Sequence, residues 1–162
     1  MQSMTLRPHH LLDIITAYGA GAEFKPHPYG HAVHTCAEIV LNDLDTEVEF
    51  IVGADFICEP CIHLVEARCD DVVSQLEPPP SKQDYNDDLD RRVFAHLQMQ
   101  AGAVMTVREF LQIVRACFEG LPEICVHPKR SVEERAANLD AGLKKLGVRN
   151  RGQSPIPAEE QE

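Results

Sequence analysis

The chain has 162 residues, of which 44% are hydrophobic and 25% are charged, so it is long enough to bury a core without disulfide bonds. Its formal net charge of −11 argues against nucleic acid and anionic membranes as partners, because both attract Lys and Arg. The charge is uneven, since residues 1–90 carry −13 and residues 91–162 carry +2.

The first third of the chain predicts two helices and one strand. Apolar residues at helical spacing, with a proline suited to the first turn and glycines at the end, predict a helix from about Pro8 to Tyr18. Two prolines and a glycine are typical of a loop over residues 22–30. A second helix is expected from His31 to about Asn42. Residues Glu47–Val52 alternate charged and apolar side chains, which predicts a strand.

The middle of the chain is less regular. Short helical turns are suggested there by four apolar residues, Leu64, Val65, Val72 and Val73. Pro78–Pro80 is a stiff break, which we interpret as a link between two halves rather than between two independent domains. Residues 84–98 have helical periodicity, and we expect Asp84 to cap that helix.

Two capping boxes mark helices in the last third of the chain. Thr106-x-x-Glu109 and Ser131-x-x-Glu134 each combine a hydroxyl with a carboxylate three residues later, before apolar residues. The second of these helices is expected to run to about Leu146, where Gly147 ends it.

These elements indicate an α+β fold that is mostly helical, a small single domain with a short sheet element and a cysteine-rich metal or cluster loop. The expected divisions are a cysteine-motif domain (1–118, with an acidic half 1–77 and a helical half 81–118 joined by Pro78–Pro80), a C-terminal helical extension (119–147) and a disordered tail (148–162).

The six cysteines are the chemically informative residues. No charged leader with an apolar run opens the chain, and no stretch reaches the ~20 apolar residues of a membrane span, so we expect a cytoplasmic protein in which disulfides are rare. Cys58, Cys61 and Cys69 have the spacing C-x2-C-x7-C in an acidic segment, which disfavours plain burial and favours a bound metal or cluster. A zinc site would require a further close pair of ligands, and a thioredoxin-like dithiol would require a βαβ setting. Neither is evident in this sequence. Three cysteines from one loop with one distant ligand suit a cubane cluster better.

The other cysteines and the histidines supply candidate partners for this loop. Cys36 lies on the second predicted helix and could reach it, whereas Cys117 has an apolar helical setting typical of the core, and Cys125 fits either role. Adjacent His9 and His10 point about 100° apart on a helix, so one metal rarely takes both, and one can act as an outer hydrogen-bond donor. A further group of three histidines is more typical of a polar helix face than of a metal site. These are His27, His31 and His34.

Two motifs resemble the family catalogued as domain of unknown function 1284, small prokaryotic proteins often described as iron–sulfur binding. Leu6–Leu12 is similar to the family's opening L-R-x-H-H-L-L-C stretch, and Asp55–Cys61 to its D-x-I-C-x-x-C segment. The resemblance covers roughly residues 5–115. It implies an iron–sulfur cluster of the 4Fe-4S type on Cys58, Cys61 and Cys69.

One departure from the family pattern leaves the fourth ligand open. The opening motif of the family ends in cysteine, where this chain has Asp13. Asp13 or Cys36 is therefore the candidate fourth ligand, with Cys125 less favoured, or one iron is open to solvent or substrate. The expected roles are electron transfer, sensing or cluster-dependent chemistry, with a basic redox partner protein suggested by the acidic half. The alternatives are a zinc-stabilised binding module and a dithiol redox protein using Cys58 and Cys61.

Overall fold

The computed structural model describes residues 4–124 and 130–149. A three-stranded sheet lies at its centre, in the order β1 (Met4–Leu6), β2 (Glu47–Phe50) and β5 (Val104–Thr106). β1 runs parallel to β2, and β5 runs antiparallel to it. Val48 and Phe50 are fully buried while Glu47 is exposed, so the predicted alternation is confirmed over the four residues of β2.

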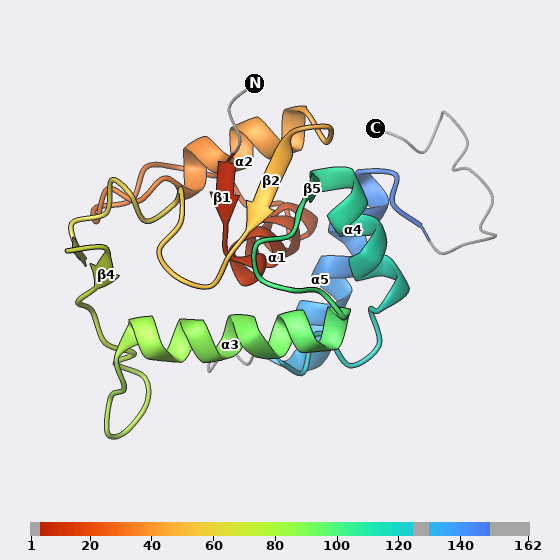
Figure 1. Cartoon of the computed structure of the whole chain (residues 1–162). Coiled ribbons are helices and arrows are strands. Elements are labelled where there is room, and N and C mark those ends of the chain that lie inside the picture. Colours follow the sequence, from red (N-terminus) through yellow and green to blue (C-terminus); the bar gives the residue numbers. More distant parts are fainter. Residues whose placement is uncertain (1–3, 125–129, 150–162) are drawn as a thin grey trace.

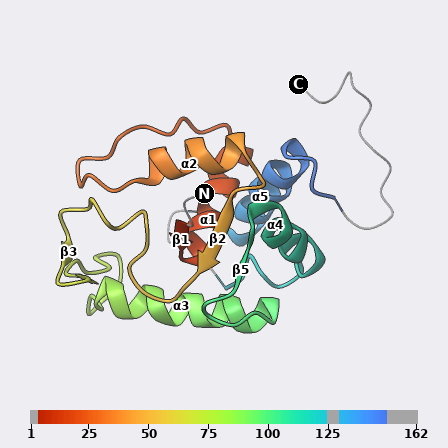
Figure 2. The same cartoon turned by 45° about the horizontal axis from the view of Figure 1, so that its top comes forward.

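In the described part of the chain, five helices surround this sheet, which confirms the mostly helical α+β class. They are α1 (Pro8–Gly19), α2 (Val33–Asn42), α3 (Lys82–Leu97), α4 (Val107–Ala116) and α5 (Val132–Lys145). In Figures 1 and 2, α2 and α3 lie on opposite sides of α1 and the sheet. Helices α4 and α5 occupy one end of the molecule, and the segment of the cysteine motif occupies the other.

The helix starts follow the capping chemistry of the sequence, with one correction. The Thr106 hydroxyl accepts from the Glu109 N–H at 3.1 Å, and the Glu109 carboxylate accepts from the Thr106 N–H at 2.9 Å, so the predicted capping box is confirmed. The Ser131 hydroxyl caps α5. The expected Asp84 cap was wrong, because the Ser81 hydroxyl caps α3 and accepts the N–H of Asp84.

The expected helical turns after the first cysteines were also wrong. The chain forms a hairpin there, with β3 (Leu64–Val65) antiparallel to β4 (Arg68–Cys69). Glu66 and Ala67 make the turn with φ of 50° and 66°, the positive values that a tight two-residue hairpin requires. This turn has none of the usual Gly or Asn residues, so the sequence carried no signal for it. Strands β1 and β5, each three residues long, were also not predicted.

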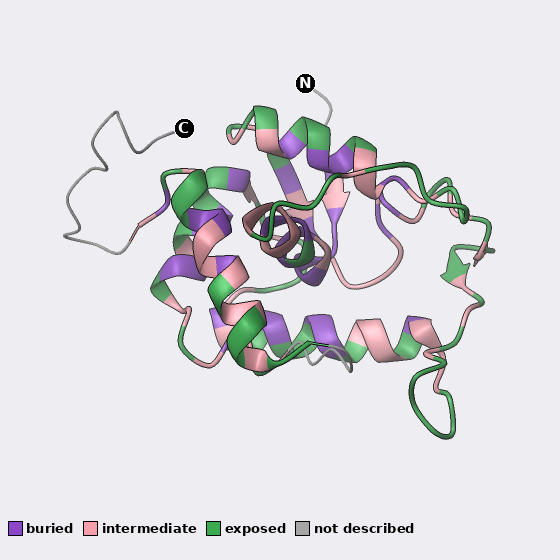
Figure 3. Cartoon of the chain, turned by 180° about the vertical axis from the view of Figure 1, so that it is seen from behind, coloured by how far each residue is buried: buried purple, intermediate pink, exposed green. Residues whose placement is uncertain are grey.

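One core spans both sides of Pro78–Pro80. Phe50 of β2 stacks on Phe110 of α4 with ring centroids 4.3 Å apart, which joins residues from before and after the prolines. The prolines belong to a largely exposed loop, visible in Figure 3, that is closed by the Val73 N–H donating to the Pro80 carbonyl at 2.9 Å. The two sequence halves therefore fold as one body.

Helix α5 is part of the same core. It packs on α1, where a Cβ atom at Gly142 would collide with the backbone oxygen of Ile15. Leu139 and Leu143 are buried, and so is Val148, whose carbonyl accepts from the Arg115 guanidinium. The expected disordered tail lies outside the described residues from 150 onward. Within the described ranges every helix is too short or too polar to span a bilayer.

Candidate functional site

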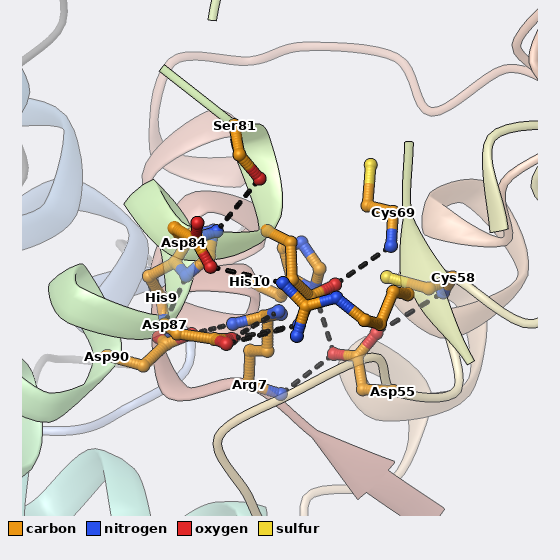
Figure 4. Close-up of polar contacts among 12 residues, drawn as sticks. Arg7, His9, His10, Asp55, Cys58, Cys69, Ser81, Asp84, Asp87 and Asp90 are labelled. Atoms are coloured by element: carbon orange, nitrogen blue, oxygen red, sulfur yellow. Dashed lines mark hydrogen bonds and ion pairs between the residues drawn. The ribbon is translucent and has the colours of Figure 1, made fainter. Parts of the chain in front are cut away.

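A buried arginine stands at the centre of the polar network in Figure 4. Arg7 follows β1, and its side chain is 2% exposed. Its Nη1 atom lies 2.8 Å from Asp90 and its Nη2 atom 2.8 Å from Asp87, both on α3. Burial alone would lower the pKa of Arg7, but the two carboxylates outweigh it and raise that pKa. Arg7 therefore remains charged and ties the start of α1 to α3.

The two histidines that follow Arg7 bind different carboxylates. His9 contacts Asp90 through its backbone N–H at 3.1 Å and through its Nδ1 atom at 2.8 Å. Burial would raise the pKa of Asp90, but His9 and Arg7 lower it. The His10 Nδ1 atom lies 2.7 Å from Asp55 instead. One histidine thus faces α3, and the other faces the cysteine loop.

Asp55 connects the start of α1 with the cysteine loop. Its carboxylate, which is fully buried, accepts the backbone N–H groups of Arg7 at 2.7 Å, Ile57 at 3.1 Å and Cys58 at 3.2 Å. Burial would raise its pKa, but His10, the Arg7 N–H and the Cys58 side chain hold that pKa at about 2. The same carboxylate overcomes the opposing effect of burial and raises the pKa of His10. Asp55 is therefore an anion that orients both the His10 ring and the first turn of the loop.

The three motif cysteines are half-buried and come from one folded segment. The Cys61 N–H donates to the Cys58 carbonyl at 2.9 Å, which forms the turn between them. The β3–β4 hairpin then returns the chain so that Cys69 pairs with Leu64, three residues beyond Cys61. The Cys69 N–H donates to the Gln83 side-chain oxygen at 2.8 Å, which anchors the hairpin to α3. The fold thus brings Cys69 back toward the C-x2-C turn.

The three motif thiols are not gathered closely enough to share one zinc ion. Tetrahedral zinc with Zn–S bonds near 2.3 Å needs sulfurs about 3.8 Å apart. Among the described residues, the one group of three donors within 4.8 Å of one another is His10, Asp55 and Cys58, and no group joins the three motif thiols. A cubane binds each cysteine at a different iron, so it accepts thiols that are further apart. The separation of the thiols therefore argues against a zinc ion held by all three of them.

The candidate fourth ligands have different surroundings. Asp13 is 56% exposed, and its carboxylate lies 3.7 Å from Arg135 of α5. Cys36 is fully buried, with its Sγ atom 3.8 Å from the Met4 sulfur, and burial together with Asp55 raises its pKa to about 12. Cys125 lies outside the described residues. Cys117 is half-buried against the core, as its apolar setting predicted.

The histidine-rich loop before α2 lies against the cysteine segment. The Ile62 N–H donates to the Tyr29 carbonyl at 2.8 Å, and the Tyr29 ring meets His63 edge-on at 4.4 Å. The rings of His27 and His31 stack with centroids 4.3 Å apart. This loop therefore packs against the cysteine segment, a contact that the sequence did not predict.

Several residues of the network were not singled out from the sequence. Asp55 was noted only as part of the resemblance, although its carboxylate is the one that holds His10. Asp87, Asp90 and Gln83 lie on α3, where acidic and amide side chains ordinarily face solvent. The Arg7–Asp90 contact joins residues 83 positions apart, so no local pattern could indicate it.

The fold and site define a small α+β protein in which a buried Arg–His–Asp network supports a half-buried cysteine loop. A family model matches residues 29–129, more than half of the chain, and the chain belongs to that family, described as protein of unknown function (DUF1284). The match includes the cysteine segment, begins after the Leu6–Leu12 motif and continues beyond residue 115, where the resemblance was expected to end. No curated protein and no solved structure matches the chain.

Proposed function

We propose that this protein binds an iron–sulfur cluster of the 4Fe-4S type through Cys58, Cys61 and Cys69. The carrying observation is the β3–β4 hairpin, which returns Cys69 toward the C-x2-C turn with all three thiols half-buried. Asp55 holds the turn and Gln83 holds the hairpin, so the loop is anchored at both ends. Such preorganisation supports a bound group rather than a freely moving loop.

The cluster, when bound, would supply one-electron chemistry for electron transfer, sensing or a cluster-dependent reaction. The protein's own contribution is electrostatic, because residues 1–90 carry a charge of −13 that opposes the arrival of an electron. The same charge suits docking to a basic redox partner protein, and the thiol-rich loop suits the reducing cytoplasm.

The test is anaerobic purification, with iron, acid-labile sulfide and zinc quantified on the full chain. We expect iron and sulfide in equal amounts, with a visible absorption band that reduction bleaches. Cys58→Ser, Cys61→Ser and Cys69→Ser are each expected to lose the band, whereas Cys117→Ser, which lies at the end of α4, keeps it. If the protein contains no acid-labile sulfide after anaerobic reconstitution, the proposal is wrong.

A zinc-stabilised binding module is the second candidate, and one observation favours it. The donor atoms of His10, Asp55 and Cys58 lie within 4.8 Å of one another, which suits a single ion. Purified protein with one zinc, no sulfide and no absorption band would establish this candidate and exclude the cluster.

A dithiol redox role for Cys58 and Cys61 has less support. Reactive dithiols have a lowered thiol pKa, whereas burial and Asp55 raise the pKa of Cys58 to about 12. The five described cysteines are free thiols. A thiol count that rises after mild reduction and falls again on oxidation would restore this alternative.

A further inference from the structure

We propose that the Nε2 atom of His10 is the fourth protein ligand of the centre on Cys58, Cys61 and Cys69. This inference rests on the proposed function and assigns the position that the sequence leaves between Asp13 and Cys36. It also changes the expected role of His10 from an outer hydrogen-bond donor to a direct ligand.

The orientation of the His10 ring carries the first step. Its Nδ1 atom lies 2.7 Å from a carboxylate oxygen of Asp55, and because a carboxylate oxygen accepts, Nδ1 carries the proton and donates. In the neutral ring that a metal ligand requires, Nε2 then has the free lone pair, and the structure gives Nε2 no hydrogen bond within residues 4–124 and 130–149. Metal-binding histidines commonly have this arrangement, in which a carboxylate holds one ring nitrogen so that the other ligates.

Asp55 is itself held in place, so the orientation of His10 is built into the fold. Three backbone N–H groups donate to its carboxylate, from Arg7, Ile57 and Cys58. The Cys58 N–H is one of them, and therefore a single carboxylate orients the proposed histidine ligand and the first proposed cysteine ligand together.

Proximity separates His10 from the other candidates. A ring nitrogen of His10 lies within 4.8 Å of donor atoms of both Cys58 and Asp55. The His10 side chain is 17% exposed. Asp13 belongs to no such group, and its exposed carboxylate faces Arg135. The Cys36 thiol belongs to none either, and it lies fully buried beside Met4.

A neutral imidazole in place of a fourth thiolate changes the charge of the centre. The bound cluster would carry one negative charge less, which raises its reduction potential and opposes the effect of the acidic surroundings. His10→Cys restores a fourth thiolate at the same position on α1. We therefore expect that variant to keep its iron and to have a lower reduction potential than the wild type.

The deciding measurement is nitrogen hyperfine spectroscopy of the reduced cluster in full-length protein. In wild type we expect a strongly coupled nitrogen, which changes from the ¹⁴N to the ¹⁵N pattern when only histidine is labelled with ¹⁵N. His10→Cys is expected to lose this coupling, and Asp13→Asn, at the exposed position one turn later, is expected to retain it. The labelling experiment needs no variant, so it tests for a histidine ligand even if His10→Cys folds poorly. The loss of the coupling in His10→Cys then assigns that ligand to His10.

The two proposals fail in different ways. Wild type with neither iron nor sulfide overturns the proposed function, and the ligand assignment with it. A normal iron and sulfide content without a histidine-derived coupling overturns the assignment of His10 and leaves the cluster in place. A coupling that persists in His10→Cys assigns the nitrogen to another histidine and also overturns it.

Discussion

Arg7 and Asp90 form an ion pair of 2.8 Å in which neither side chain is more than 2% exposed. A second carboxylate, Asp87, binds the other terminal nitrogen of Arg7 at 2.8 Å, and His9 binds the far oxygen of Asp90. Buried charges are costly unless every one of them has a partner. The network is therefore a fixed joint between the β1–α1 connection and α3, and the cysteine segment is attached to both sides of this joint.

Removing the arginine is expected to destabilise the fold strongly. Arg7→Met leaves Asp90 and Asp87 without their cation, and breaking a buried pair in this way costs about 3–5 kcal/mol. Urea denaturation of the metal-free protein measures the loss. Arg92→Met is the matched control, because the pair of Arg92 with Asp88 on the same helix is exposed and is worth at most about 1 kcal/mol. Equal losses in the two variants would contradict the proposed joint.

The same network predicts a dependence of stability on pH. The folded-state pKa of Asp90 is lowered from 3.8, so its stabilisation is present above that value and is lost as the pH falls through the folded-state pKa. The difference in free energy of unfolding between wild type and Asp90→Asn should therefore shrink from pH 7 to about pH 3. Urea titrations at both pH values measure it, with exposed Asp88→Asn as the control. A difference that stays constant would show that Asp90 has no charge-dependent role.

Sequence reasoning found the elements whose signals are local. The helix at Pro8 and the capping box of Thr106 depend on residues within a few positions, and the structure confirms both. The β3–β4 hairpin was missed because Glu66 and Ala67 are not typical residues for positive φ. Strands of three residues are too short to establish an alternation, and β1 and β5 obtain their hydrogen bonds from β2.

The candidate site likewise has one part that a local pattern predicts and another part that depends on long-range contacts. The cysteine spacing is a local pattern, and it pointed to the loop that the structure folds around Cys58. The role of Asp55 depends on contacts with α1, 45 to 48 residues away, and the partners of Arg7 lie on α3. Which side chain of α1 faces the loop is set by that long-range packing. The sequence alone therefore left the fourth ligand between Asp13 and Cys36, and our proposal of His10 depends on that packing.

The close contact of α1 with α5 gives a third prediction. Alanine normally stabilises a helix relative to glycine, by about 1 kcal/mol. In Gly142→Ala the new methyl group would collide with the Ile15 backbone oxygen and side chain, so we expect a net destabilisation of about 1–3 kcal/mol. Thermal unfolding monitored by circular dichroism measures it. Ala137→Ser, on the exposed face of α5, should change stability by no more than about 0.5 kcal/mol. A stabilised Gly142→Ala would show that the two helices separate easily.

The last prediction concerns Gln83, which joins the hairpin to the central network. Gln83 is 3% exposed, accepts the Cys69 N–H at 2.8 Å and donates to Asp87 at 3.1 Å. Gln83→Leu keeps the volume but removes both hydrogen bonds, so Cys69 loses its anchor on α3. Outer-shell partners of this kind are worth about 10–100-fold in metal affinity, and we expect a corresponding acceleration of iron release to a chelator. Gln100→Leu, at an exposed position, controls for the loss of an amide. If folded Gln83→Leu releases iron at the wild-type rate, Cys69 is not a ligand, because the position of Cys69 depends on its hydrogen bond to Gln83.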